Sequence, residues 1–156
     1  MRWRNSRLGR ALRASRGATL VETAVVIPLL LLVTFGLVEF GAMFYAYLAL
    51  ENGVSQATRY AVTGNQMPNM TRDASIIAMM RQTTPTLTIA DGAFTFSHLP
   101  AGGSAWVSGT GGPGDIEKVT VDYTWKIITP LLWPLFPKGQ FHIQVASAMK
   151  NESRFQ

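Results

Sequence analysis

The residues whose types and spacing suit chemistry lie near the N-terminus. Gly17 and Ala18 form a small-residue junction behind a basic leader, and Glu22 lies one turn inside the apolar run that follows. A lone carboxylate in lipid costs several kcal/mol unless it is neutralised or paired. Glu22 therefore either sits at the membrane interface, near headgroups or leader arginines, or pairs with an α-amine. Cleavage between Gly17 and Ala18 would create that amine, on this subunit or a neighbour, and the spacing fits both interpretations.

The rest of the chain offers no catalytic set. His98 and His142 are the only histidines, and no metal-binding spacing joins them. Asp115 and Glu117 supply half of a cation site, which lacks further close ligands. The glycine-rich stretch 100–114 has no Gly-Lys-Ser/Thr ending for a phosphate, and the chain has no cysteine for thiolate chemistry, metal binding or disulfides. We therefore expect no enzyme, no cofactor and no metal.

The apolar run is long enough to cross a bilayer. No charge occurs from Thr23 to Val38, and the 22 residues from Ala18 to Glu39 span about 32 Å as a helix. A hydrocarbon core is about 30 Å thick. A buried helix of a soluble protein would show a polar face, and a cleaved secretory signal would be shorter and end in small residues. The sequence predicts a transmembrane helix over residues 18–42.

Charge is concentrated before this helix. The net charge is +5, yet six arginines and no acid precede residue 18, while residues 18–156 carry eight basic and nine acidic groups. The positive-inside rule then places residues 1–17 in the cytoplasm as a leader and residues 43–156 on the other side. The folded part has no basic excess, so we expect no nucleic-acid partner. The leader arginines are Arg2, Arg4, Arg7, Arg10, Arg13 and Arg16.

One α+β domain is expected outside the membrane. The helix should continue over residues 43–63, with a kink at Pro28 inside the membrane, and end at Gly64–Asn65. A short helix over 70–82, with Thr71 or Asn69 as its cap, and three or four antiparallel strands within 86–149 should follow. The expected strands are a hairpin of 86–90 and 93–97 around Asp91-Gly92, then 116–128 and 141–149.

Two further features suggest contacts. Small residues recur at helical spacing and permit close approach, either to the protein's own sheet or to a helix of another subunit. Residues 130–137 contain three prolines that disfavour regular structure, so their apolar side chains either contact a partner or membrane, or fold over the core. The small residues are Ala42, Ala46, Ala49, Gly53 and Ala57.

The pattern Gly17-Ala18-x-x-x-Glu22, after a basic leader and before an apolar helix, resembles the class III signal cut by prepilin peptidase in type IV pilin-like proteins. The continuation Val21–Leu31, then Phe35–Gly41 and Ala57–Ala61, resembles the TadE family of the tight adherence (Flp) pilus system. The resemblance covers the N-terminal third and extends weakly to the C-terminal strands. Major Flp pilins are much shorter and usually have Tyr where Thr23 stands.

The resemblance implies a minor pilin or pseudopilin, cut between Gly17 and Ala18, with Glu22 serving processing or assembly. It also implies a prepilin peptidase, a TadF-like pseudopilin, other secretion-complex or pilus subunits, and inner-membrane lipid as partners. The protein would be single-pass, with a periplasmic domain, and would stay in the inner membrane or enter the pilus. The alternative is an uncleaved single-span protein whose outer domain binds a ligand or partner. A membrane-tethered hydrolase is the third reading.

Overall fold

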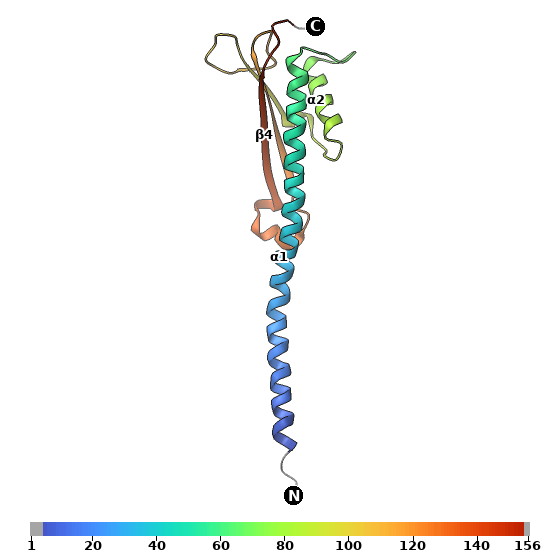
Figure 1. Ribbon diagram of the computed structural model, residues 1–156, viewed down its shortest axis with the longest axis vertical. Helices are drawn as coiled ribbons and strands as arrows, with labels where there is room; N and C mark the ends of the chain where they lie inside the picture. The colour runs from blue at the N-terminus through green and yellow to red at the C-terminus, as the bar shows by residue number, and fades with distance from the viewer. Residues whose placement is uncertain (1–4, 155–156) are drawn as a thin grey trace.

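The protein is a long helical rod that carries a small sheet at one end. The computed structural model describes the backbone of residues 5–154 and the side chains of residues 18–154. Helix α1 (Asn5–Val62) runs through the whole length, and the remaining elements pack only against its C-terminal part (Figure 1). The α+β class predicted from the sequence, with a long N-terminal helix on an antiparallel sheet, is confirmed.

The sheet has four antiparallel strands in the order β2-β1-β3-β4. Helix α2 lies beside the upper part of α1, away from the sheet's long strands (Figure 1). The elements after α1 are α2 (Arg72–Thr83), the 3₁₀ turn η1 (Asp91–Ala93), β1 (Phe94–Leu99), β2 (Val107–Ser108), β3 (Ile116–Lys126), the 3₁₀ turns η2 (Pro130–Leu135) and η3 (Pro137–Gly139), and β4 (Gln140–Lys150).

The core forms because β3 and β4 alternate between apolar and polar residues. Val119 and Val121 of β3 are fully buried, and Val121 pairs with the buried Val145 of β4. Side chains of opposite parity, such as Lys126, face outward. The same buried cluster contains Leu50, Val54, Ala57 and Ala61 from α1, and Ile76 and Met80 from α2, which packs on α1.

The helix boundaries follow the expected signals. Gly64 adopts φ 71° after the last turn of α1, and its N–H donates to Ala61 O at 3.0 Å. Glycine tolerates this left-handed backbone at a helix C-terminus. Thr71 caps α2 by accepting the N–H of Ala74 at 3.2 Å. The predicted stop at Gly64 and the predicted cap at Thr71 are confirmed.

The predicted hairpin around Asp91-Gly92 is wrong. Residues 86–90 form no strand, and β1 pairs instead with β3, where Phe94 lies opposite Val121. The Asp-Gly pair lies in the 3₁₀ turn η1, because the preceding segment is tied to the end of α2. Arg81 donates to Ile89 O at 2.7 Å and forms an ion pair with Asp91.

Three smaller expectations also change. Helix α1 starts at Asn5 and not at residue 18, because the leader from Asn5 onward contains good helix formers such as Arg, Leu and Ala. The helix continues through Pro28 as one element, so the expected kink does not interrupt it (Figure 1). The proline-rich segment, expected to disfavour regular structure, forms the ordered turns η2 and η3. Arg2, Arg4 and the other leader side chains lie outside the described residues.

Candidate membrane-anchoring and assembly site

Residues 18–31 of α1 present an apolar surface that no described part of the chain covers. Among the described residues, one helix is long and apolar enough to cross a membrane, and its apolar stretch is not buried by the rest of the protein. Leu20 is 71% exposed and Leu29 is 62% exposed. Such a surface needs an apolar environment that the chain itself does not supply. The helix is therefore consistent with a single-pass membrane protein.

Ala18 and Glu22 lie on this uncovered part of α1. Both are exposed, and their spacing of four residues places them one turn apart on the same helix face. Within the part of the chain whose side chains are described, no hydrogen bond or ion pair involves Glu22. Gly17 lies within α1, but its surroundings fall outside the described residues. The fold thus brings no other described element to the predicted processing site.

The stripe of small residues is divided between the inside and the surface. Ala46, Gly53 and Ala57 are buried in the chain's own fold. A Cβ placed on Gly53 would collide with the Thr84 methyl group and lie 3.3 Å from Met80, so the glycine lets α2 and its C-terminal end approach α1. Ala42 and Ala49 are half-buried. This part of the stripe therefore packs within the subunit, whereas its predicted role between subunits remains a prediction.

Glu39 lies where the uncovered half of α1 meets the domain. Its side chain is only 5% exposed. The indole N–H of Trp125 donates to Oε1 at 2.8 Å, and the backbone N–H of Thr129 donates to Oε2 at 3.0 Å. The backbone N–H of Ile128 lies 3.1 Å from both carboxylate oxygens. These bonds fix the end of β3 and the start of the following turns against the helix.

An apolar hollow borders Glu39, which forms part of its lining. It is formed between α1, from Leu32 to Met43, and the turn η2, which contributes Leu132 and Leu135. Leu132 is buried, whereas Leu131, Trp133 and Leu135 of the same turn are each at least half exposed. The proline-rich segment therefore folds against α1 on one side and keeps an apolar surface on the other.

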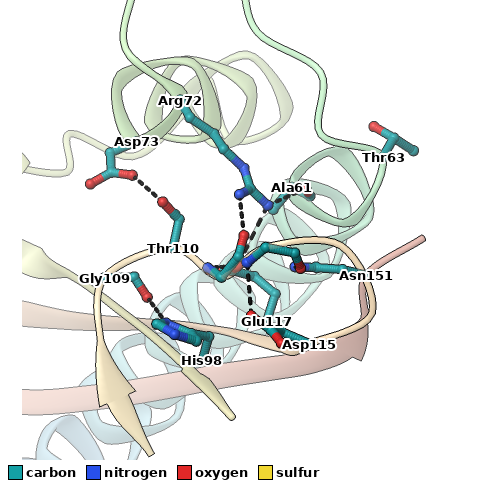
Figure 2. A network of polar contacts seen from close by, with 12 residues as sticks. Ala61, Thr63, Arg72, Asp73, His98, Gly109, Thr110, Asp115, Glu117 and Asn151 are labelled. Atoms are coloured by element: carbon teal, nitrogen blue, oxygen red, sulfur yellow. Dashed lines mark hydrogen bonds and ion pairs between the residues drawn. The ribbon is translucent and has the colours of Figure 1, made fainter. Parts of the chain in front are cut away.

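A polar network closes the opposite end of the sheet (Figure 2). Arg72 of α2 donates to the carbonyl oxygens of Ala61 and Gly111 and lies 3.6 Å from the Glu117 carboxylate. The N–H of Gly111 donates to Glu117 at 2.8 Å. The network joins both helices, the glycine-rich segment and β3. It also accounts for a buried carboxylate on the core face of β3, which the alternation alone did not predict.

The two acids considered as half of a cation site serve this fold internally. Asp115 accepts the N–H groups of Ala101 and Gly112, and these bonds hold its pKa below the ordinary value of 3.8. Burial raises the pKa of Glu117 above 4.5, although Gly111 N–H and Arg72 act in the opposite direction. The described residues contain no group of three or more metal-ligating side chains close enough to hold an ion.

The histidines lie apart, on strands separated by β3. His98 Nδ1 lies 2.9 Å from Gly109 O, beside the polar network, where Figure 2 shows it pointing into the glycine-rich segment. His142 lies on the outer face near Asp122, at 3.5 Å. The topology does not bring the two imidazoles together, so they do not form a shared site.

The uncovered apolar helix and the sheet at its far end define an α+β protein with one candidate membrane-spanning helix among the described residues. Residues 17–59 match the family model described as TadE-like protein, which confirms the resemblance seen in the sequence. The match and the helix together indicate a membrane-anchored protein related to Tad pili, and the family is structural and not enzymatic. Neither a curated protein nor a solved structure matches the chain.

Glu39 is the residue whose role the sequence did not reveal. It was visible as the acid that ends the uncharged run and as part of the Glu-Phe-Gly segment. Its donors follow 86 to 90 positions later in the chain, beyond any local pattern. The only signal was an acid beside an apolar run. Such an acid needs a hydrogen-bond partner, but the local sequence does not identify the partner.

Proposed function

We propose that the protein is a TadE-like minor pilin or pseudopilin that supports assembly of a Flp/Tad-type adhesion pilus. The observation that carries this proposal is the division of α1. Its C-terminal part packs on the protein's own sheet, while residues 18–31, which include Glu22, are exposed and not covered by any element of the described chain. A helix of this kind supplies both a membrane anchor and a surface for the helices of neighbouring subunits. The match over residues 17–59 supports the same assignment.

Processing by a prepilin peptidase would remove residues 1–17. The cut consumes one water molecule, releases the leader with a carboxylate on Gly17, and leaves a positively charged amine on Ala18. That amine would lie about one helical turn, roughly 6 Å, from Glu22 on the same face. In a medium of low dielectric constant the two charges would attract strongly, within one subunit or between two. Glu22 therefore has a chemical reason to lie at this spacing.

The proposed location is the bacterial inner membrane, with the N-terminus in the cytoplasm and the sheet domain in the periplasm. The arginine-rich leader supports this orientation. The proposed partners are the prepilin peptidase, a TadF-like pseudopilin, and other Tad secretion-complex or pilus subunits. Gly36 and Gly41 add room for a neighbouring helix, because a Cβ on either would meet nothing within 4 Å.

The test is co-expression of the full chain with a prepilin peptidase, followed by mass spectrometry of the purified protein. We expect the mature chain to begin at Ala18. Gly17→Val should keep the leader attached, whereas Gly9→Val, a change of the same kind within the leader, should still be cut. A wild-type chain that retains its leader would refute processing and would favour the uncleaved single-span alternative.

A further inference from the structure

We propose that residues 128–137 form a second membrane contact, which lies in the outer boundary of the same bilayer that α1 crosses. The inference rests on the proposed membrane span of α1 but adds an element that the span does not require. We call this segment the interfacial loop. It comprises residues 128 and 129, which follow β3, then the turn η2, Phe136 and the first residue of η3.

Position is the first reason. Helix α1 crosses about 32 Å between Ala18 and Glu39, so Glu39 lies at the outer edge of the hydrocarbon region. Glu39 binds the start of the interfacial loop, and the hollow that Glu39 lines extends along α1 to Leu32, about 10 Å closer to the bilayer centre. The loop therefore lies beside the last apolar turns of the span, continuous with the surface that contacts lipid (Figure 1).

The side chains of the loop are the second reason. Ile128 is 67% exposed and Leu135 is 65% exposed, with Leu131 and Trp133 about half exposed between them. Lys126 and Lys138 flank this apolar surface, as the lining of the adjoining groove shows. Apolar and aromatic residues bordered by lysines are typical of segments at a membrane–water boundary, where the ammonium groups reach lipid phosphates.

Backbone hydrogen bonding is the third reason. Irregular backbone near hydrocarbon is tolerated only when its polar groups are satisfied within the protein. Three residues of the loop are prolines, which have no N–H to satisfy. Ile128 and Thr129 donate to Glu39, and Leu132 and Phe136 donate to carbonyl groups of Thr129 and Trp133.

Trp133 completes this arrangement. Its indole N–H donates to Ile127 O at 2.9 Å, so the polar atom of the ring is satisfied by the protein. The ring is 52% exposed and is therefore free to contact acyl chains without giving up a bond to water. Glu39 therefore has a second role besides stabilising the fold. It accepts hydrogen bonds from N–H groups that would otherwise need water, and these groups would otherwise oppose placing the loop in the membrane interface.

The chain's lack of cysteine makes site-directed spin labelling a direct test. The full chain would carry one nitroxide, at Leu131→Cys or Leu135→Cys, in vesicles of phosphatidylethanolamine and phosphatidylglycerol. Collision of the label with oxygen reports lipid, and collision with a water-soluble nickel chelate reports solvent. Leu29→Cys, within the span, and Ala105→Cys, in the exposed glycine-rich segment, are the matched controls.

We expect the labels at 131 and 135 to lose access to the nickel chelate and to keep access to oxygen, as at 29. Nickel access equal to that at 105 would overturn the proposal, since the loop would then face water. Loss of access to both reagents would also overturn it, because the loop would then face another protein. Failure of the span itself would be recognised separately, since the label at 29 would then not report lipid.

Discussion

Two carboxylates on the same helix behave in opposite ways. Glu39 is buried and accepts hydrogen bonds from Trp125, Ile128 and Thr129. Glu22 is exposed and has no such partner among the side chains that the structure describes. An acid satisfied within the chain serves the fold. Glu22 lies in an apolar surface and has no partner in the described part of the chain, so its proposed role in processing or assembly is separate from the folding role of Glu39.

The glycines of α1 show the same division. A Cβ on Gly53 would collide with Thr84, whereas one on Gly41 would meet nothing within 4 Å. Gly53 therefore gives room to the protein's own α2 and its C-terminal end. Gly41 leaves its room open on the surface of the helix. The position of Gly53 is therefore used for packing inside the fold, whereas the position of Gly41 leaves open space on the helix surface.

The largest effect should come from Glu39→Ala. The change leaves three N–H donors without their acceptor and should cost about 3 kcal/mol of unfolding free energy. Denaturant unfolding of the full chain in detergent, followed by tryptophan fluorescence, would measure the loss. Glu51→Ala, which removes an exposed acid of the same helix, should change stability by less than about 0.5 kcal/mol. Equal stability of the two variants would contradict the role given to Glu39.

Gly53→Ala should be the next largest. The added methyl group forces Thr84 or Met80 to shift in a packed interface, which typically costs about 1–3 kcal/mol. Gly41→Ala should be neutral or stabilise the isolated subunit by about 0.5–1 kcal/mol, because alanine restricts the unfolded chain and meets no neighbour. The same unfolding measurement compares them, and a Gly53→Ala protein as stable as Gly41→Ala would contradict the close packing of α1 against Thr84 and Met80 at Gly53.

A smaller effect should appear in the pH dependence of stability. Burial raises the pKa of Glu117 in the folded state above its ordinary value of 4.5. The folded protein then holds this proton to higher pH than the unfolded chain, so this residue lowers stability as pH rises from about 4.5 through the folded-state pKa. Glu117→Gln should lack that decline in a pH series of melting temperatures.

Asp115 provides the opposite sign in the same network. Its N–H donors lower its folded pKa below 3.8, so its contribution is lost as pH falls through that lower value. Asp115→Asn should therefore remove part of the acid sensitivity and leave the decline above pH 4.5 in place. Identical pH profiles for wild type and both variants would contradict the electrostatics assigned to this end of the sheet.

The sequence predicted those features that depend on neighbouring residues, and it missed those that depend on contacts between residues far apart in the chain. Strand β3 and the end of α1 were predictable because alternation and Gly64 are local signals. The hairpin failed because the Asp91-Gly92 signal is also local, while a long side chain, Arg81, ties the preceding segment to α2. The Glu39 contacts and the Glu117 network join residues far apart in the chain, and no local pattern records them.

The candidate processing site shows the complementary case. Gly17, Ala18 and Glu22 were identified from spacing and family resemblance, and the described fold brings no other element to them. Their proposed role depends on a peptidase and on other subunits, which the fold of a single chain does not contain. The role of these residues stays a prediction, which the sequence alone can make because the signal is linear.

The most direct test is to replace Glu22 by Ala and to recover the protein's membrane partners by co-purification, with Glu51→Ala as the matched control. Glu22→Ala should leave the unfolding free energy within about 0.5 kcal/mol of wild type, since no described side chain depends on it. It should also leave membrane insertion intact and sharply reduce partner recovery. Partner recovery equal to that of Glu51→Ala would contradict the proposed role of the exposed N-terminal part of α1, which includes Glu22, in assembly.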